Sequence, residues 1–104
     1  MSQFVKVGTT ANFGDEDSGK LVEAEGLRIA VFRVAGKYYA IEDICPHRGG
    51  ALSDGVLNED AVTCPWHGAQ FNVKTGAVLR PPAQRGVKSF PIRVTGADVE
   101  VEID

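Results

Sequence analysis

Short runs of Val, Ile, Phe and Tyr recur along the chain, with Gly-containing or polar breaks between them. Runs of this kind, bounded by turn residues, are typical of the strands of a small antiparallel β protein. The predicted strands are Phe4–Val7, Lys20–Ala24, Leu27–Val34, Lys37–Ile41, Ala61–Thr63, Gln70–Val73, Lys88–Val94 and Asp98–Ile103. No stretch keeps the period of a long helix, so the pattern predicts an all-β fold.

The breaks between these runs predict turns and one longer loop. Ala35-Gly36 lies between two of the predicted strands, which we therefore expect to form a hairpin. Asn12–Gly19 is polar and acidic and is predicted to be a surface loop. Further turns are expected at Asn58-Glu59-Asp60, Lys74-Thr75-Gly76 and Thr95-Gly96-Ala97. The aromatic residues interpreted as core and strand positions are Phe4, Phe32, Tyr38, Tyr39 and Phe90.

Length and charge narrow the possible functions. The chain has 104 residues, the size of one domain, and 43% of them are hydrophobic, as in an ordinary globular protein. We therefore expect a single domain over residues 1–104. The formal net charge of −3 argues against a nucleic-acid partner, which needs clustered Lys and Arg. Mild acidity is compatible with docking to a basic patch on another protein.

The sequence also carries no sign of a membrane or of export. It has no apolar run long enough to span a bilayer, and its first residues lack the basic and then apolar pattern of a signal peptide. We therefore expect a cytoplasmic protein with no membrane partner. Thiols stay reduced in that compartment, which argues against a disulfide between Cys45 and Cys64.

All the cysteines and histidines of the chain fall into two short boxes. The first is Cys45-Pro46-His47-Arg48-Gly49, and the second is Cys64-Pro65-Trp66-His67-Gly68. Together they read C-x-H and, sixteen residues later, C-x2-H. Two thiolates and two imidazoles make a set of metal ligands.

Several chemistries could use these four side chains. A tetrahedral zinc accepts two Cys and two His, but the usual zinc patterns place like ligands in the same box. Here each box mixes one Cys with one His, as a two-iron centre requires if one iron binds both thiolates and the other both imidazoles. A Cys–His nucleophilic pair would leave one box without a role. Unrelated buried Cys and surface His remain the structural alternative.

The boxes and their flanks resemble the Rieske [2Fe–2S] family. The resemblance rests on Cys45 to Leu52, on Cys64 to Phe71 and on Thr75-Gly76, and it extends over nearly the whole chain. It implies a Rieske fold: an antiparallel β-sandwich base with a small cluster-binding lobe, inserted from about Cys45 to Phe71. Pro81-Pro82 resembles the family's proline-containing loop, which covers the cluster.

The chain looks most like the soluble ferredoxins of bacterial aromatic-ring-hydroxylating dioxygenase systems. That resemblance implies an electron carrier without catalytic chemistry of its own, serving aromatic hydrocarbon catabolism. Its partners would be a flavoprotein ferredoxin reductase, fed by NAD(P)H, and a terminal oxygenase. Carried over by position, Cys45 and Cys64 would bind the buried iron of one [2Fe–2S] cluster, and His47 and His67 the outer iron.

Two positions after the second box bear on the reduction potential. High-potential members of the family carry a Ser and a Tyr there, whose hydroxyls donate to sulfur, whereas this chain has Ala69 and Phe71. High-potential members also have an additional cysteine pair, which is absent here. The resemblance therefore implies a potential near the low end of the Rieske range, roughly −150 mV.

The resemblance also implies where partners dock and which functions compete. Electrons would leave through the two His rings, and the docking tip would comprise Pro46, His47, Arg48, Pro65, Trp66 and His67. The small subunit of an NAD(P)H nitrite reductase shares the fold and is one alternative function. A zinc-stabilised binding module and a redox sensor are two others.

Overall fold

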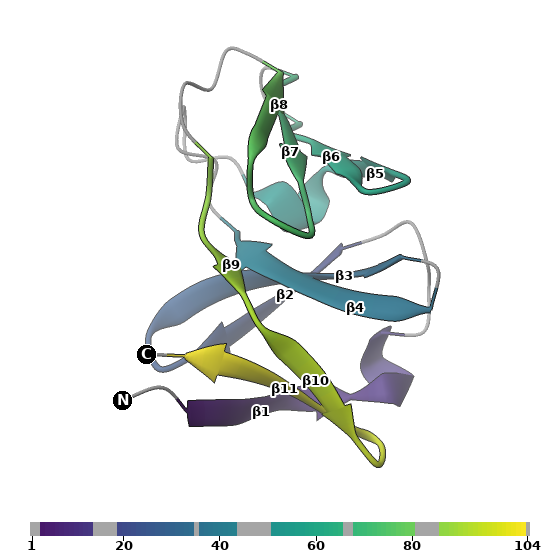
Figure 1. Cartoon of the computed structure of the whole chain (residues 1–104), viewed down its shortest axis with the longest axis vertical. Helices are drawn as coiled ribbons and strands as arrows, with labels where there is room; N and C mark the ends of the chain where they lie inside the picture. The colour runs from purple at the N-terminus through teal and green to yellow at the C-terminus, as the bar shows by residue number, and fades with distance from the viewer. Residues whose placement is uncertain are drawn as a thin grey trace.

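The structure, a computed structural model, describes residues 3–13, 19–34, 36–43, 51–65, 68–80 and 86–103 (Figure 1). The described strands form three sheets, and every pairing in them is antiparallel. The first sheet has the order β1 (Gln3–Thr9), β11 (Asp98–Ile103) and β10 (Ile92–Thr95). The second has the order β2 (Gly19–Ala24), β3 (Leu27–Val34), β4 (Lys37–Glu42) and β9 (Ser89–Phe90).

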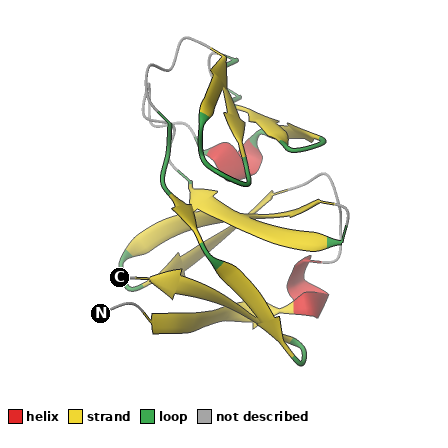
Figure 2. Ribbon diagram, in the orientation of Figure 1, coloured by secondary structure: helices red, strands yellow, loops and turns green. Residues whose placement is uncertain are grey.

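The third sheet forms a separate lobe above the other two (Figures 1 and 2). Its order is β5 (Val56–Asn58), β6 (Ala61–Thr63), β7 (Gln70–Asn72) and β8 (Val78–Arg80). Two short 3-10 helices complete the described elements, η1 (Thr10–Phe13) and η2 (Leu52–Asp54). The predicted all-β Rieske architecture, a sandwich base with a small lobe, is confirmed. The described part of the chain has no helix long and apolar enough to cross a membrane.

The second sheet is buried on both faces, because its central strand has apolar side chains on both sides. Along β3, Ile29 and Val31 pack into the core between the first and second sheets, which we call the base core. The alternate residues Ala30 and Phe32 pack into the core under the third sheet, the lobe core. Successive side chains of a strand point to opposite faces, so an unbroken apolar run marks a strand covered on both sides.

Pro91 is the point where the chain passes from the second sheet to the first. β9 pairs with β4, whereas β10 pairs with β11. Proline has no N–H to donate to a ladder, but the carbonyl of Pro91 accepts a hydrogen bond from the N–H of Glu102 at 2.8 Å. The prediction of one unbroken strand over Lys88–Val94 was therefore wrong, and this proline is the physical reason.

Other predicted elements agree with the structure to different degrees. The strands Leu27–Val34, Ala61–Thr63 and Asp98–Ile103 have the predicted bounds. The predicted loop over Asn12–Gly19 was wrong at both ends, because Phe13 is buried and Gly19 begins β2. Residues 14–18 lie outside the described residues. The ring of Phe13 packs edge-on against Tyr38, with 6.0 Å between ring centroids, which gives this residue its place in the base core.

The lobe sheet is longer than the sequence indicated. β5 and β8, its two edge strands, were not predicted as strands, and β8 extends the sheet to Arg80, beyond the expected end of the lobe near Phe71. Each is only three residues long and exposes an apolar side chain, Val56 in β5 and Leu79 in β8. Three residues carry few positions for an alternating pattern, although the equally short β6 was predicted with its observed bounds.

Candidate metal centre

The second box begins directly after β6, in the loop that joins β6 to β7. The N–H of Cys64 donates to the carbonyl of Ala69 at 2.7 Å, and the N–H of Gly68 donates to the carbonyl of Cys64 at 3.2 Å. Gly68 has a φ of +77°, a left-handed conformation that glycine adopts without steric cost. The β6–β7 register thus continues through Cys64, and the loop is closed at its base by these backbone hydrogen bonds and by one from Gln70 Nε2 to Thr63 Oγ1 at 3.2 Å.

Cys64 is a buried thiol, with 2% of its surface exposed, and belongs to the lobe core together with Leu52, Phe71 and Val87. A lone thiolate in an apolar core is unfavourable, and a coordinated metal offsets its charge. The site therefore suits the sulfur ligand of a buried iron. The ligand role of Cys64 stays a prediction.

The other predicted ligands, Cys45, His47 and His67, lie outside the described residues. The same holds for Pro46, Arg48 and Trp66 of the predicted docking tip and for Pro81-Pro82 of the predicted covering loop. Pro65, which follows Cys64, is described and exposed. Among the described residues no group of three His, Cys, Asp or Glu side chains could hold a metal ion.

The segment that carries the first box is closed at its base by Asp43, the residue after β4. The carbonyl of Asp43 accepts a hydrogen bond from the N–H of Leu52 at 2.6 Å, and its carboxylate Oδ1 accepts one from the N–H of Ser53 at 2.8 Å. Both donors belong to η2. These contacts hold together the two ends of the segment 44–51. Sequence reasoning missed Asp43 because a single Asp after a strand is ordinary for a loop.

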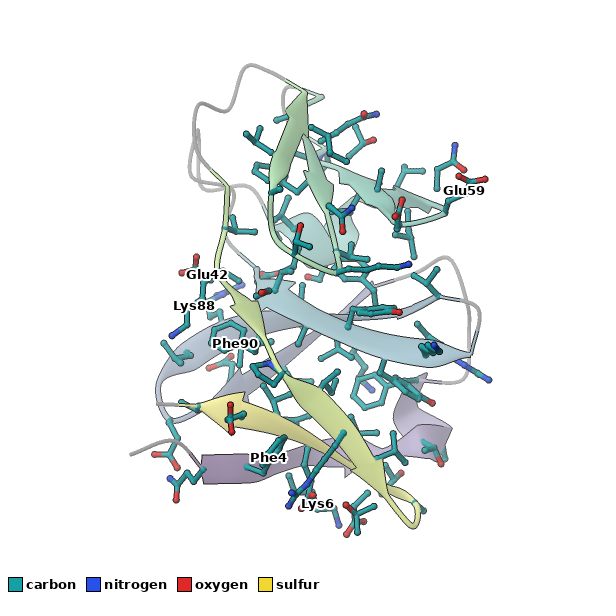
Figure 3. The ribbon with its side chains drawn as sticks, viewed as in Figure 1. Phe4, Lys6, Glu42, Glu59, Lys88 and Phe90 are labelled. Atoms are coloured by element: carbon teal, nitrogen blue, oxygen red, sulfur yellow. The ribbon has the colours of Figure 1, made fainter. Side chains whose placement is uncertain are left out.

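Residues 86–88, which we call the strap, lead from the lobe back to the base. The N–H of Val87 donates to the carbonyl of Gly76 at 2.8 Å. Lys88 donates its N–H to the Glu42 carboxylate at 2.7 Å and accepts from the N–H of Glu42 at 2.9 Å. Figure 3 shows these two residues side by side at the junction of base and lobe. The strap brings Val87 against the core that contains Cys64.

Ala69 and Phe71 replace the Ser and Tyr of high-potential members of the family. Both are fully buried in the lobe core with Cys64. Their burial places them beside the predicted ligand, where a hydroxyl would act in an apolar medium. The low reduction potential stays a prediction, and both positions are suitable for substitutions that test it.

A groove of about 460 Å³ lies elsewhere, between β4 and β10 of the base. It is lined by residues 36–39 and 92–94, and none of these belongs to the lobe. The groove is therefore formed by strands of the base, and its Tyr39 also packs against the lobe core.

Known proteins resemble this chain in sequence and in fold. The sequence model of the Rieske [2Fe-2S] domain family matches residues 3–91. A curated relative, the 3-phenylpropionate/cinnamic acid dioxygenase ferredoxin subunit of Escherichia coli (strain K12), is 41% identical, over 78% of this chain and 83% of its own length.

Two solved structures are also similar to this chain. One is a complex of reduced oxygenase and oxidized ferredoxin in carbazole 1,9a-dioxygenase, with a TM-score of 0.87 and 33% identity, covering 94% of this chain and 91% of the matched chain. The other is a proposed NADH-dependent nitrite reductase small subunit from Mycobacterium tuberculosis, with a TM-score of 0.89 and 20% identity, covering 100% of this chain and 97% of the other. At that identity the second likeness concerns the fold alone.

Proposed function

Because this chain belongs to the Rieske [2Fe-2S] domain family, we propose that it carries single electrons from a flavoprotein reductase to a terminal ring-hydroxylating oxygenase. It is a ferredoxin, the electron-transfer component of such a system, and not its catalytic subunit. The observation that carries the proposal is the 41% identity with a dioxygenase ferredoxin subunit over most of both chains. The substrate of the partner oxygenase would be an aromatic compound, as in the names of the relatives.

The proposed cofactor is one Rieske-type [2Fe–2S] cluster, which accepts and releases one electron. Cys45 and Cys64 are proposed to bind one iron, and His47 and His67 the other. The burial of Cys64 in the lobe core supports a sulfur-ligated iron on the inner side. Replacing two thiolates of a four-Cys cluster by neutral imidazoles removes negative charge and raises the potential into the Rieske range, about −150 to +300 mV.

Partner docking is proposed at the tip of the lobe, at Pro46, His47, Arg48, Pro65, Trp66 and His67. Pro65, the one described residue of this set, is exposed and lies next to a buried proposed ligand. An exposed tip beside a buried redox centre shortens the path between the centre and a docked partner. The terminal oxygenase partner is supported by the likeness to a ferredoxin found in complex with its oxygenase. The reductase is the partner that an NAD(P)H-fed carrier requires.

A visible spectrum and a low-temperature EPR spectrum, before and after dithionite, test this proposal. We expect a brown protein with a rhombic signal that appears on reduction and differs from that of a four-Cys cluster. His67→Ala and Cys64→Ser should each abolish the colour and the electron transfer. Pro65→Ala, an exposed position in the same loop, should leave the spectrum unchanged and serves as the matched control.

The same measurement decides between the ferredoxin and its rivals. A colourless protein with stoichiometric zinc, even after reconstitution with iron and sulfide, would indicate a binding module instead. A reducible cluster in His67→Ala would overturn the ligand assignment. The nitrite reductase alternative has the weaker support, because its likeness at 20% identity concerns the fold alone. Reconstitution with a sirohaem partner, compared with a terminal oxygenase, separates those two functions.

A further inference from the structure

Asp43 is the one charged or polar residue that is fully buried within the described ranges of the chain. It follows β4 and precedes Cys45 by two residues. Consecutive Cα atoms are about 3.8 Å apart, so covalent geometry alone keeps this carboxylate close to a proposed iron ligand. A buried charge is costly unless something offsets it, and the contacts of Asp43 show what does so here.

Asp43 is held from three sides. Its N–H donates to the carbonyl of Arg28 on β3 at 3.1 Å, and its own carbonyl accepts from Leu52. Carboxylate Oδ1 accepts from the N–H of Ser53 at 2.8 Å. The residue thus connects β3, the end of β4 and η2. It fixes both the start and the end of the segment that carries the first box.

The negative charge on the second carboxylate oxygen of Asp43 is less well compensated. Oδ2 is buried and, among the described residues, has no hydrogen-bond partner. Among the described residues, the cation beside it is the guanidinium of Arg28, whose Nη2 lies 3.6 Å away, beyond hydrogen-bonding distance. The Arg28 side chain is 49% exposed, so water screens part of its charge. Within the described residues, the pair therefore leaves negative charge in the protein interior, where electrostatic interactions reach further than in water.

We propose that Asp43 is a positioning residue for the first ligand loop and that its buried charge lowers the reduction potential of the centre, with Arg28 as a partial counterion. The inference rests on the proposed function and deepens it. Reduction moves one electron from an external donor to the centre, which becomes more negative by one unit. The Asp43 carboxylate disfavours that added charge, and the Arg28 cation favours it.

Two substitutions separate these opposed charges. Asp43→Asn keeps the shape and the Oδ1 acceptor for Ser53 but removes the negative charge, so the midpoint potential should rise. Arg28→Met removes the cation and keeps an apolar stem, so the potential should fall. We expect each shift to correspond to about a tenfold change in the ratio of reduced to oxidised protein, or about 59 mV for one electron. Asp54→Asn removes an equal charge at an exposed position of η2 and should leave the potential unchanged.

The positioning role is tested by comparing Asp43→Ala with Asp43→Asn in the holoprotein. The alanine variant loses the acceptor for Ser53, so amide hydrogen exchange at Ser53 should accelerate and the EPR line shape should change. The asparagine variant should restore both to the wild-type result. If the alanine variant does not fold, the opposite shifts of Asp43→Asn and Arg28→Met still decide the charge effect.

The outcomes also distinguish this inference from the proposed function. A wild-type protein without a reducible cluster overturns the proposed function. A normal cluster whose potential is unmoved in both charge variants, or shifts in the same direction in both, overturns the charge effect alone. Wild-type exchange at Ser53 in Asp43→Ala overturns the positioning role.

Discussion

The base core and the lobe core lie against opposite faces of one sheet, yet they are built differently. The base core is enclosed by longer strands, including β1 with seven residues and β3 with eight, and its members are apolar. The lobe core is covered by strands of three residues each and includes the thiol of Cys64. The base thus buries continuous strand faces, whereas the lobe encloses a proposed ligand under short pieces of chain.

The lobe compensates for its short strands with close backbone contacts. A Cβ on Gly55 would overlap the carbonyl oxygen of Thr63, and one on Gly76 would overlap that of Val87. A Cβ on Gly86 would meet the carbonyl of Gly76. Such approaches leave no room for side chains and tolerate little change in shape. Both cores bury apolar side chains, and the lobe adds these close backbone contacts and the proposed metal.

The largest expected effects come from removing one large side chain on each face of β3. Phe32→Ala empties part of the lobe core and Ile29→Ala part of the base core, and both residues are fully buried. Each should lower the free energy of unfolding by about 2–5 kcal/mol, measured by chemical denaturation. Only Phe32→Ala should also alter the visible spectrum and midpoint potential. Equal effects on the spectrum from both variants would contradict the separation of the two cores.

A matched pair of glycines tests the tight fit of the lobe. Gly76 has a φ of +80° and touches the strap, whereas Gly96 has a φ of +63° and open space around it. Gly96→Ala should cost about 1 kcal/mol of unfolding free energy, from backbone strain alone. Gly76→Ala carries the same strain and must also displace Val87, so we expect about 2–3 kcal/mol. Similar losses in the two variants would show that the strap contact contributes nothing.

Hydroxyl groups added to the lobe core should change the potential, and those added to the base core should not. Ala69→Ser with Phe71→Tyr supplies the donors found in high-potential Rieske proteins. One new hydrogen bond of about 1.4 kcal/mol to the reduced centre corresponds to a rise of about 59 mV, measured by redox titration. Val101→Thr adds a hydroxyl to the base core and is the control. An unchanged potential in the double variant would mean that solvent exposure dominates.

The smallest expected effect lies on the base surface, at Glu100. The carboxylate accepts a hydrogen bond from Arg93 Nε at 2.7 Å and one from Thr95 Oγ1 at 3.1 Å. The Arg93 hydrogen bond is the main reason that the pKa of Glu100 lies below its ordinary value of 4.5. A lowered folded-state pKa gives stability that is present above the unfolded pKa and is lost as pH falls through the folded pKa.

Thermal unfolding of the Glu100→Gln variant, compared with the wild type, tests the direction of this pH dependence. A small difference in melting temperature should be present at pH 7 and should disappear as the pH falls below 4.5 towards the lowered pKa. Glu23→Gln, an exposed glutamate on β2, is the control and should show no such trend. A difference in melting temperature that grows as the pH falls would contradict the lowered pKa of Glu100. The visible spectrum should be unchanged throughout, because Glu100 belongs to the first sheet.

The long strands could be predicted because their sequence patterns are long enough to read. Leu27–Val34 and Asp98–Ile103 were found with their observed bounds, since six or more residues reveal burial on one or both faces. Val78–Arg80 could not be found, because its strand character comes from pairing with β7 and not from its own residues. The break at Pro91 was missed although proline is a clear signal, because the flanking residues are apolar on both sides.

The candidate site could be predicted in its chemistry but not in its supports. Cys64 stands out because the chain has only two cysteines, each paired with a histidine in a box. Its burial and the closure of its loop follow from the β6–β7 register, which the sequence does not display. Asp43 was missed because its contacts depend on how η2 returns to the end of β4, a tertiary arrangement that no local pattern encodes.

The first sheet pairs the earliest described strand with the latest, and this has a consequence for synthesis on the ribosome. Gln3 lies opposite Ile103 in the β1–β11 ladder. β1 therefore remains without its partner until β11 has been translated, while the hairpin of β2 and β3 can already close through contacts nearby in sequence. Translation at about 5–20 residues per second leaves β1 exposed for several seconds. The base can therefore be completed only after β11 has been translated.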